Sequence, residues 1–113
     1  KLVAKDATAV SAFTALEMAT INGAKALGLD ESIGSLEIGK QADIIAIDLS
    51  DFRQQPLYNP ISQLVYTNIS QHVCHVWVSG KALVNDSKLT TLSATELATS
   101  ASHWQQKISH NNL

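Results

Sequence analysis

The stretch IGSLEIGKQADIIAIDL, residues 33–49, is the most tightly punctuated part of this 113-residue chain. Its two glycines, Gly34 and Gly39, stand five residues apart. Glycine allows positive φ angles and close backbone approach, so residues 30–40 are predicted to form a connector. The run at residues 42–49 is apolar at both alternating sets of positions. It therefore predicts a strand that is covered on both faces.

A helix is predicted upstream of the connector, over residues 9–28. Apolar and small side chains recur there at intervals of three and four residues and form one face: Phe13, Leu16, Thr20, Gly23, Ala24 and Leu27. Small residues on this face would let a neighbouring element approach the helix backbone closely. A break is expected near Thr20, which can cap a new helical segment, and Gly28 stands where a glycine commonly ends a helix.

The residues after the first strand predict a mainly β region that ends in a helix. Residues 50–60 contain both prolines and form a loop, and residues 60–66 form a short helix that begins with proline. Strands are predicted at residues 73–78 and 81–84, joined by a tight Ser-Gly turn. Residues 93–96 form a capping box that begins a last helix. That helix has an apolar stripe, expected to pack on its own domain rather than on a second subunit: Ala94, Leu97, Ala101, Trp104 and Ile108.

Composition excludes several classes of protein. The formal net charge is −2 and the pI is about 6.0, so no electrostatic feature indicates nucleic acid or an anionic membrane as a partner. No apolar run approaches the roughly 18 residues that span a bilayer. A single cysteine, Cys74, excludes an internal disulfide framework and is typical of the reducing cytoplasm, where we expect the protein. The chain begins at Lys1 without a methionine, which indicates truncation.

One cluster has the residue types of a metal site, His72-Val73-Cys74-His75. On a strand, His72 and Cys74 would point to one face and His75 to the other, so the three side chains cannot converge on one ion. The remaining histidines, His103 and His110, fall in or beyond the last helix. A structural role is therefore predicted for the cluster.

The aspartates of the first strand do not form a catalytic pair either. Asp43 and Asp48 are five residues apart and therefore on opposite faces, so they are interpreted as residues that end the strand and form turns. The sequence contains no G-x-S-x-G, G-x-x-x-x-G-K-[ST] or H-E-x-x-H motif. We expect no catalytic, cofactor-binding or metal-ligating residue in this chain.

The stretch at residues 19–49, ATINGAKALGLDESIGSLEIGKQADIIAIDL, resembles the C-terminal signature of the amidohydrolase superfamily. The blocks at residues 59–67, 75–86 and 89–97 resemble the chlorohydrolase and deaminase branch, and in particular its 5-methylthioadenosine/S-adenosylhomocysteine deaminases. The residues that match the signature are Ala24, Leu27, Gly28, Ile33, Gly34, Ser35, Leu36, Gly39, Lys40, Ala42 and Asp43.

The resemblance implies a parent enzyme with a (β/α)₈ barrel. A divalent metal, usually zinc, is held there by a His-x-His pair, further histidines and an aspartate, and the hydroxide it generates displaces ammonia from a purine. All of these ligands lie upstream of the matching segment. The expected fold is α+β: residues 1–30 are the last helical part of the barrel, and residues 31–113 are part of a composite β-sandwich with a final helix.

The resemblance also implies a role. The chain is expected to be a C-terminal fragment of a metal-dependent deaminase, structural by itself, whose partner is the remainder of its parent chain. In isolation, its unpaired strand edge is expected to cause self-association. Two alternatives remain open: a stand-alone β-rich interaction module, or the tail of an amidohydrolase that acts on a triazine, guanine or cytosine ring.

Overall fold

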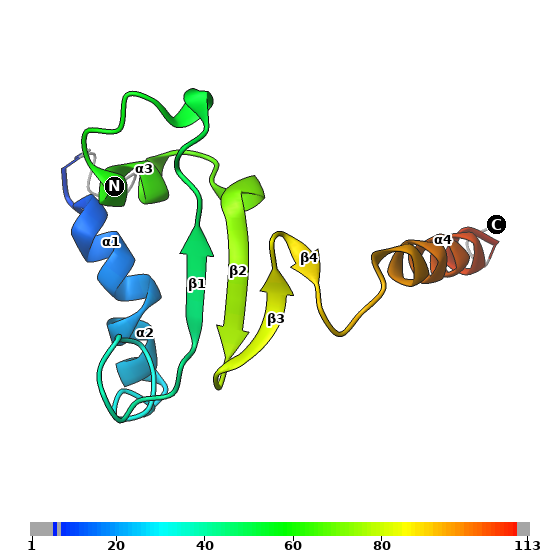
Figure 1. The fold of residues 1–113 in the computed structure, drawn as a ribbon, viewed down its shortest axis with the longest axis horizontal. Coiled ribbons are helices and arrows are strands. Elements are labelled where there is room, and N and C mark those ends of the chain that lie inside the picture. The colour runs from blue at the N-terminus through cyan, green and yellow to red at the C-terminus, as the bar shows by residue number, and fades with distance from the viewer. Residues whose placement is uncertain (1–5, 7, 111–113) are drawn as a thin grey trace.

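The computed structural model describes residue 6 and residues 8–110 and has an α+β fold, as predicted (Figure 1). One antiparallel sheet has the strand order β1-β2-β3-β4, with two helices before it and one after it. The elements are α1 (Ala12–Ala19), α2 (Ile21–Ala26), β1 (Ile44–Ile47), the 3₁₀ turn η1 (Phe52–Gln54), α3 (Pro60–Tyr66), the 3₁₀ turn η2 (Ser70–His72), β2 (Val73–Val78), β3 (Lys81–Asn85), β4 (Lys88–Leu89) and α4 (Ala94–His110). None of these helices is long and apolar enough to cross a membrane.

The predicted break in the first helix is confirmed at Thr20, but its mechanism differs from the prediction. Ser11 caps α1, because its hydroxyl accepts a hydrogen bond from the Thr14 amide at 3.0 Å. Thr20 does not cap α2 with its side chain. Its hydroxyl instead donates back to the carbonyl of Leu16 at 2.7 Å, a bond that competes with capping.

The end of α2 is the predicted glycine stop. Gly28 has φ +69°, and its amide donates to the carbonyl of Lys25 at 3.0 Å. The next amide, of Leu29, donates to the carbonyl of Ala24 at 2.9 Å. These two bonds form a Schellman motif, which satisfies the last carbonyls of the helix and turns the chain sharply.

The connector packs directly on the helix pair at Gly34, which has φ +92°. A Cβ atom at this position would lie 2.7 Å from the Cβ of Ala24 and 3.0 Å from the Cα of Ile21. Ala24 is the one hydrophobic residue that is buried among those described, with 4% of its surface exposed. The predicted close approach to the small-residue face is therefore confirmed, and only glycine fits this contact.

Lys40 closes the connector into a compact loop. Its ammonium group donates to the carbonyl of Asp30 at 2.5 Å and to the hydroxyl of Ser35 at 2.7 Å, and it lies 3.4 Å from a carboxylate oxygen of Glu37. Only 13% of the Lys40 side chain is exposed. Because this ammonium group is largely buried and has three oxygen partners, it can hold the two ends of the connector together more firmly than an exposed ion pair would.

Asp43 attaches the end of the connector to the sheet. Its carboxylate accepts a hydrogen bond from the Ser79 amide at 2.6 Å, and the Ser79 hydroxyl donates to the side chain of Gln41 at 2.9 Å. The amide of Gly80 donates to the carbonyl of Ala42 at 3.0 Å. The interpretation of Asp43 as a turn-forming residue is confirmed, and the turn it supports is the β2–β3 hairpin.

The sheet corrects two expectations. The strand predicted at residues 42–49 is shorter, and its Ile45 is 58% exposed, so the strand is not covered on both faces by the described residues. The sequence analysis also missed β4. The turn before it, Asp86-Ser87, has φ angles of +46° and +59° without a glycine, so the usual hairpin signal is absent.

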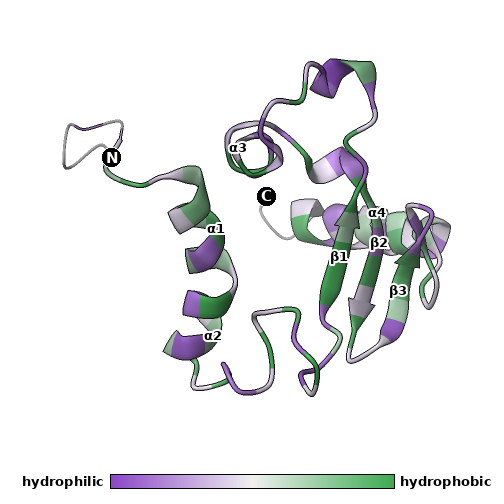
Figure 2. Cartoon of the chain, turned by 60° about the vertical axis from the view of Figure 1, so that its left-hand side comes forward, coloured by the Kyte–Doolittle hydropathy of each residue, from purple (hydrophilic) through white to green (hydrophobic). Residues whose placement is uncertain are grey.

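Helix α4 extends away from the sheet instead of packing on it (Figure 1). In the turned view of Figure 2, the same helix is seen behind the strands. The Ser93 hydroxyl accepts from the Glu96 amide at 3.3 Å, which confirms the N-cap of the predicted capping box. The apolar stripe is not covered: Leu97, Trp104 and Ile108 are 46%, 55% and 58% exposed. The prediction that this stripe packs on its own domain is wrong for the part of the chain that the structure describes.

The chain has far more surface than a self-contained domain of its size. Its accessible area is 8899 Å², whereas a folded monomer of 12.1 kDa exposes about 6,000 Å². Its radius of gyration is 18.5 Å, whereas a compact domain of this length has about 13 Å. The excess area of about 2,900 Å² includes many apolar side chains that have no cover among residue 6 and residues 8–110.

The Gly34 contact predicts a strong effect of a single methyl group. Gly34→Ala should lower the free energy of unfolding by about 3 kcal/mol, because it adds both a clash with Ala24 and a positive φ angle for alanine. Gly39→Ala is the matched control, since Gly39 has φ +96° but nothing within 4 Å of an added Cβ; it should cost about 1 kcal/mol. Urea unfolding followed by circular dichroism would measure both, and equal losses would contradict the packing role.

The contacts of Glu37 in the connector predict a pH-dependent contribution to the stability of the fold. The pKa of Glu37 lies below its usual value of 4.5, first because the Ser35 hydroxyl donates to its carboxylate and then because of Lys40. Glu37 therefore stabilises the fold above the pKa it has in the unfolded chain, and this contribution is lost as the pH falls through the folded pKa. Lys40→Met should raise the Glu37 pKa in a carboxyl NMR titration, whereas Lys25→Met should not. An unchanged Glu37 pKa in Lys40→Met would contradict the network.

Candidate functional site

Among the described residues, the polar side chain that is most enclosed is Gln54 of η1, with 7% of the residue's surface exposed. Its carbonyl oxygen accepts from the side-chain amide of Gln63 in α3 at 2.6 Å, and its amide nitrogen lies 3.1 Å from Nε2 of His72 in η2. Because the oxygen faces a donor, the amide nitrogen donates to the imidazole, which then carries its proton on Nδ1. This network joins the 50–59 loop, α3 and the start of β2.

His72 lies just before the strand that carries Cys74 and His75. It belongs to η2, and β2 begins at Val73, as the predicted strand at residues 73–78 does. Its Nε2 atom is already used by Gln54, and its carbonyl accepts from the Asp48 amide at 2.8 Å. His72 therefore connects elements of the fold and is not free to bind a ligand through Nε2.

Cys74 and His75 have separate partners. The thiol of Cys74 donates to the carbonyl of Ala46 at 3.3 Å. The ring of His75 stacks on Trp77 with centroids 5.4 Å apart, and its Nε2 lies 3.6 Å from the carboxylate of Asp86. No group of three or more His, Cys, Asp and Glu side chains that could hold a metal ion occurs within the described ranges.

The acidic residues of the 48–53 segment shape the loop. Asp48 accepts from the Ser50 amide at 2.8 Å, and hydrogen bonds from Ser50 hold the Asp48 pKa below its usual value. Asp51 forms a two-pronged pair with Arg53 at 3.0 and 2.7 Å, which holds the pKa of Asp51 well below its usual range. A general acid must keep a proton near neutral pH, so lowered pKa values argue against that role for both aspartates.

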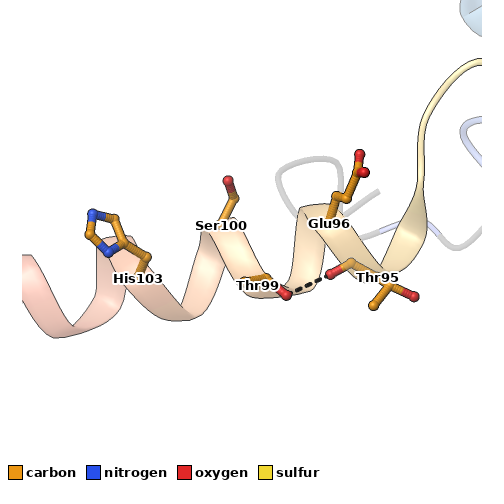
Figure 3. Close-up of a pocket in the computed structure, with 5 residues that line it drawn as sticks. All are labelled: Thr95, Glu96, Thr99, Ser100 and His103. Atoms are coloured by element: carbon orange, nitrogen blue, oxygen red, sulfur yellow. Dashed lines mark hydrogen bonds between the residues drawn. The ribbon is translucent and has the colours of Figure 1, made fainter.

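A shallow depression lies on the surface of α4 (Figure 3). The Thr99 hydroxyl donates to the carbonyl of Thr95 at 2.9 Å, which is a bond within the helix. A single helix supplies the whole lining, all of it exposed, so no opposite wall encloses a ligand. The lining residues are Thr95, Glu96, Thr99, Ser100 and His103.

The polar side chains of the described residues mainly have structural partners. The polar side chains described above are used in turns, in a hairpin or in contacts between elements. The ring nitrogens of His72 and His75 contact Gln54 and Asp86 rather than a nucleophile that either imidazole could activate. The sequence analysis missed Gln54 and Gln63, because a glutamine in a loop and one in a short helix carry no sequence pattern that indicates their contact. Gln54 and Gln63 connect the 50–59 loop to α3 and therefore have a structural role.

Comparison with known proteins identifies the segment as a whole. Residues 1–83 match the model of the amidohydrolase family. Over 108 residues, or 96% of this chain, the sequence is 56% identical to a 5-methylthioadenosine/S-adenosylhomocysteine deaminase of Teredinibacter turnerae and covers 24% of that protein. It is 53% identical over the same length to the corresponding deaminase of Saccharophagus degradans, again covering 24%. The chain thus spans about a quarter of the length of these relatives.

Two solved structures share the fold. An adenosine deaminase from Xanthomonas campestris with bound zinc superposes with a TM-score of 0.92 at 42% identity, over 97% of this chain and 25% of that one. An atrazine chlorohydrolase from Arthrobacter aurescens with zinc superposes with a TM-score of 0.76 at 28% identity, over 83% of this chain and 20% of that one. The predicted resemblance is confirmed, and this chain belongs to the amidohydrolase family.

Proposed function

We propose that this chain is the C-terminal part of a metal-dependent amidohydrolase that hydrolytically deaminates an adenosine-type nucleoside, such as methylthioadenosine or S-adenosylhomocysteine. The observation that carries the proposal is the 56% identity, over 96% of the chain, to a protein named for that activity. In this proposal the segment itself is structural. It packs on the body of the enzyme and contributes no catalytic residue.

The surface of the chain supports a structural role within a larger fold. The high TM-score over 97% of the chain means that its extended shape, including the projecting α4, is also found in a quarter of the adenosine deaminase chain from Xanthomonas campestris. An extended segment with uncovered apolar residues is expected where further chain completes the core. A stand-alone interaction module accounts less well for an excess of about 2,900 Å² of surface.

The metal that the family implies does not fit the residues present. The possible ligands His72, Cys74 and His75 have separate partners, and the part of the chain that the structure describes offers no three-ligand group. We therefore assign the metal ligands of the proposed deaminase to its remaining three quarters. No step of the reaction is assigned to a side chain of this segment.

A substrate with another ring is the second candidate, and one observation speaks for it. The atrazine chlorohydrolase has the same fold over 83% of this chain, so the segment itself does not discriminate between ring systems. The lower identity of 28%, compared with 56% for the deaminase of Teredinibacter turnerae, favours the adenosine-type substrate.

We assign residues 1–30 to the end of the proposed barrel and residues 31–113 to the composite β-sandwich. The connector is the boundary, because Gly34 packs on α2 and Asp43 binds the β2–β3 turn. A cytoplasmic location, consistent with a single reduced cysteine, is part of the same proposal.

The partner of the segment, in this proposal, is the rest of its own polypeptide. Among residue 6 and residues 8–110, strand β1 pairs with β2 on one side only, so its other edge offers unpaired backbone groups. The isolated chain should therefore self-associate, and light scattering should give a molar mass above the 12.1 kDa of the monomer. A monomer at all concentrations would contradict the free-edge argument.

A segment exchange tests the function directly. The chain replaces the matching segment of the Teredinibacter turnerae deaminase, and ammonia release from methylthioadenosine is measured with zinc present. The chimera should keep kcat/KM within about tenfold of the parent, because in this proposal the segment adds no catalytic group and it is 56% identical to the segment it replaces.

The control is the isolated 113-residue chain, which should show no turnover above the uncatalysed rate. Atrazine and guanine serve as alternative substrates for the chimera. A folded chimera without deaminase activity, or measurable turnover by the chain alone, would contradict the proposal.

A further inference from the structure

The hydrogen bonds among Gln63, Gln54 and His72 run in one direction. The amide nitrogen of Gln63 donates to the oxygen of Gln54 at 2.6 Å, and the amide nitrogen of Gln54 lies 3.1 Å from Nε2 of His72. This direction holds only while Nε2 is an acceptor, which requires a neutral ring with its proton on Nδ1. The state of one imidazole therefore determines how two glutamine side chains are oriented.

Protonation of His72 removes that acceptor. Both ring nitrogens of an imidazolium are donors, so Nε2 and the Gln54 amide nitrogen would then be two donors in contact. Only 7% of the surface of Gln54 is exposed, so water cannot readily replace the lost bond. If both amides turn over, His72 donates to the oxygen of Gln54, and the nitrogen of Gln54 donates to the oxygen of Gln63. The reversed chain again has a partner for each of these groups.

Thr67 is compatible with both directions. Its hydroxyl donates to the backbone carbonyl of Gln63 at 2.8 Å and lies 3.5 Å from the side-chain oxygen of Gln54. A hydroxyl has one proton and two acceptor sites. With its proton on the Gln63 carbonyl, the Thr67 oxygen can accept from Gln54 once that amide is reversed. The surroundings of Gln54 can therefore satisfy either orientation.

Two carboxylates lie near the ring of His72. Hydrogen bonds from Ser50 lower the pKa of Asp48, and the charge of His72 also lowers it. The pKa of Asp51 is lowered first by Arg53 and to a smaller extent by His72. Helix α3 carries no Asp, Glu, His, Lys or Arg, and the titratable side chains of β2 have the separate partners described above. An imidazolium at this position is therefore attracted by both carboxylates.

We propose that Gln63, Gln54 and His72 form a pH-sensitive relay, in which protonation of His72 reverses both glutamine amides. A charge gained in η2 then changes the atom that Gln63 presents to Gln54 from α3. Histidine is suited to this role, because its charge ordinarily changes between about pH 5 and 8. The inference concerns a device within the segment and does not depend on the substrate of the parent enzyme.

The test determines the position of the His72 proton by NMR of the full-length chimera with isotope-labelled histidine and glutamine. Gln63→Glu replaces a donor with a carboxylate that can only accept, so Gln54 must turn over and His72 must donate through Nε2. At about pH 8 the proton should therefore be on Nδ1 in the unsubstituted chimera and on Nε2 in Gln63→Glu. A proton that stays on Nδ1 in folded Gln63→Glu overturns the relay.

Two control variants separate reversal from simpler effects. Gln63→Met removes the donor without supplying an acceptor, so Gln54 has no reason to turn and the His72 proton should stay on Nδ1. Gln71→Glu adds the same charge beside His72 on an exposed side chain outside the relay, and it should also leave the proton on Nδ1. A proton on Nε2 in either control means that bond loss or charge alone moves it, and the inference is then wrong.

A titration provides the second measurement and needs no change in the relay. From about pH 8 to about pH 5, the side-chain amide signals of Gln54 and Gln63 should shift together with the ring signals of His72. In Gln54→Met the Gln63 amide should lose this response, because the link between α3 and η2 is missing. A Gln63 amide that does not follow His72 in the unsubstituted chimera overturns the relay. None of these measurements requires turnover, so an inactive chimera would contradict the proposed function alone.

Discussion

The contact of Gly34 with Ala24 is the constraint on which the arrangement of this chain depends. It sets how closely the connector approaches the helix pair, and no side chain fits between them. From there Lys40 closes the loop and Asp43 binds the β2–β3 turn, so helices and sheet are joined through one short segment. The conspicuous spacing of glycine, lysine and aspartate is therefore explained by the joining of the helices to the sheet.

The hydrophobic core of the described chain is incomplete. Only one hydrophobic residue and one polar residue among those described are buried, Ala24 and Gln54, and the two lie in different parts of the fold. The hydrogen bonds are nevertheless well formed, and no described buried side-chain polar atom lacks a partner. Local structure is thus complete while hydrophobic burial is not, which is the state expected of a segment whose core is shared with further chain.

The sequence predicted features that depend on neighbouring residues and failed where distant ones decide. The break at Thr20, the stop at Gly28 and the strand at residues 73–78 follow from local signals and are confirmed. The expectations that Ile45 is covered and that α4 packs on its own domain failed, because both depend on contacts with distant residues, which local sequence signals do not specify. The contact of Gln54 with His72 spans 18 positions and leaves no periodic pattern.

Asp43 offers the most direct test that the signature is architectural. In the full-length chimera, Asp43→Ala removes the acceptor for the Ser79 amide and should lower the Tm by about 5 °C. At 25 °C, well below that Tm, kcat/KM for methylthioadenosine should stay within about twofold of the unsubstituted chimera. A loss of about 100-fold in kcat/KM with an unchanged Tm would place Asp43 in the chemistry and contradict the account.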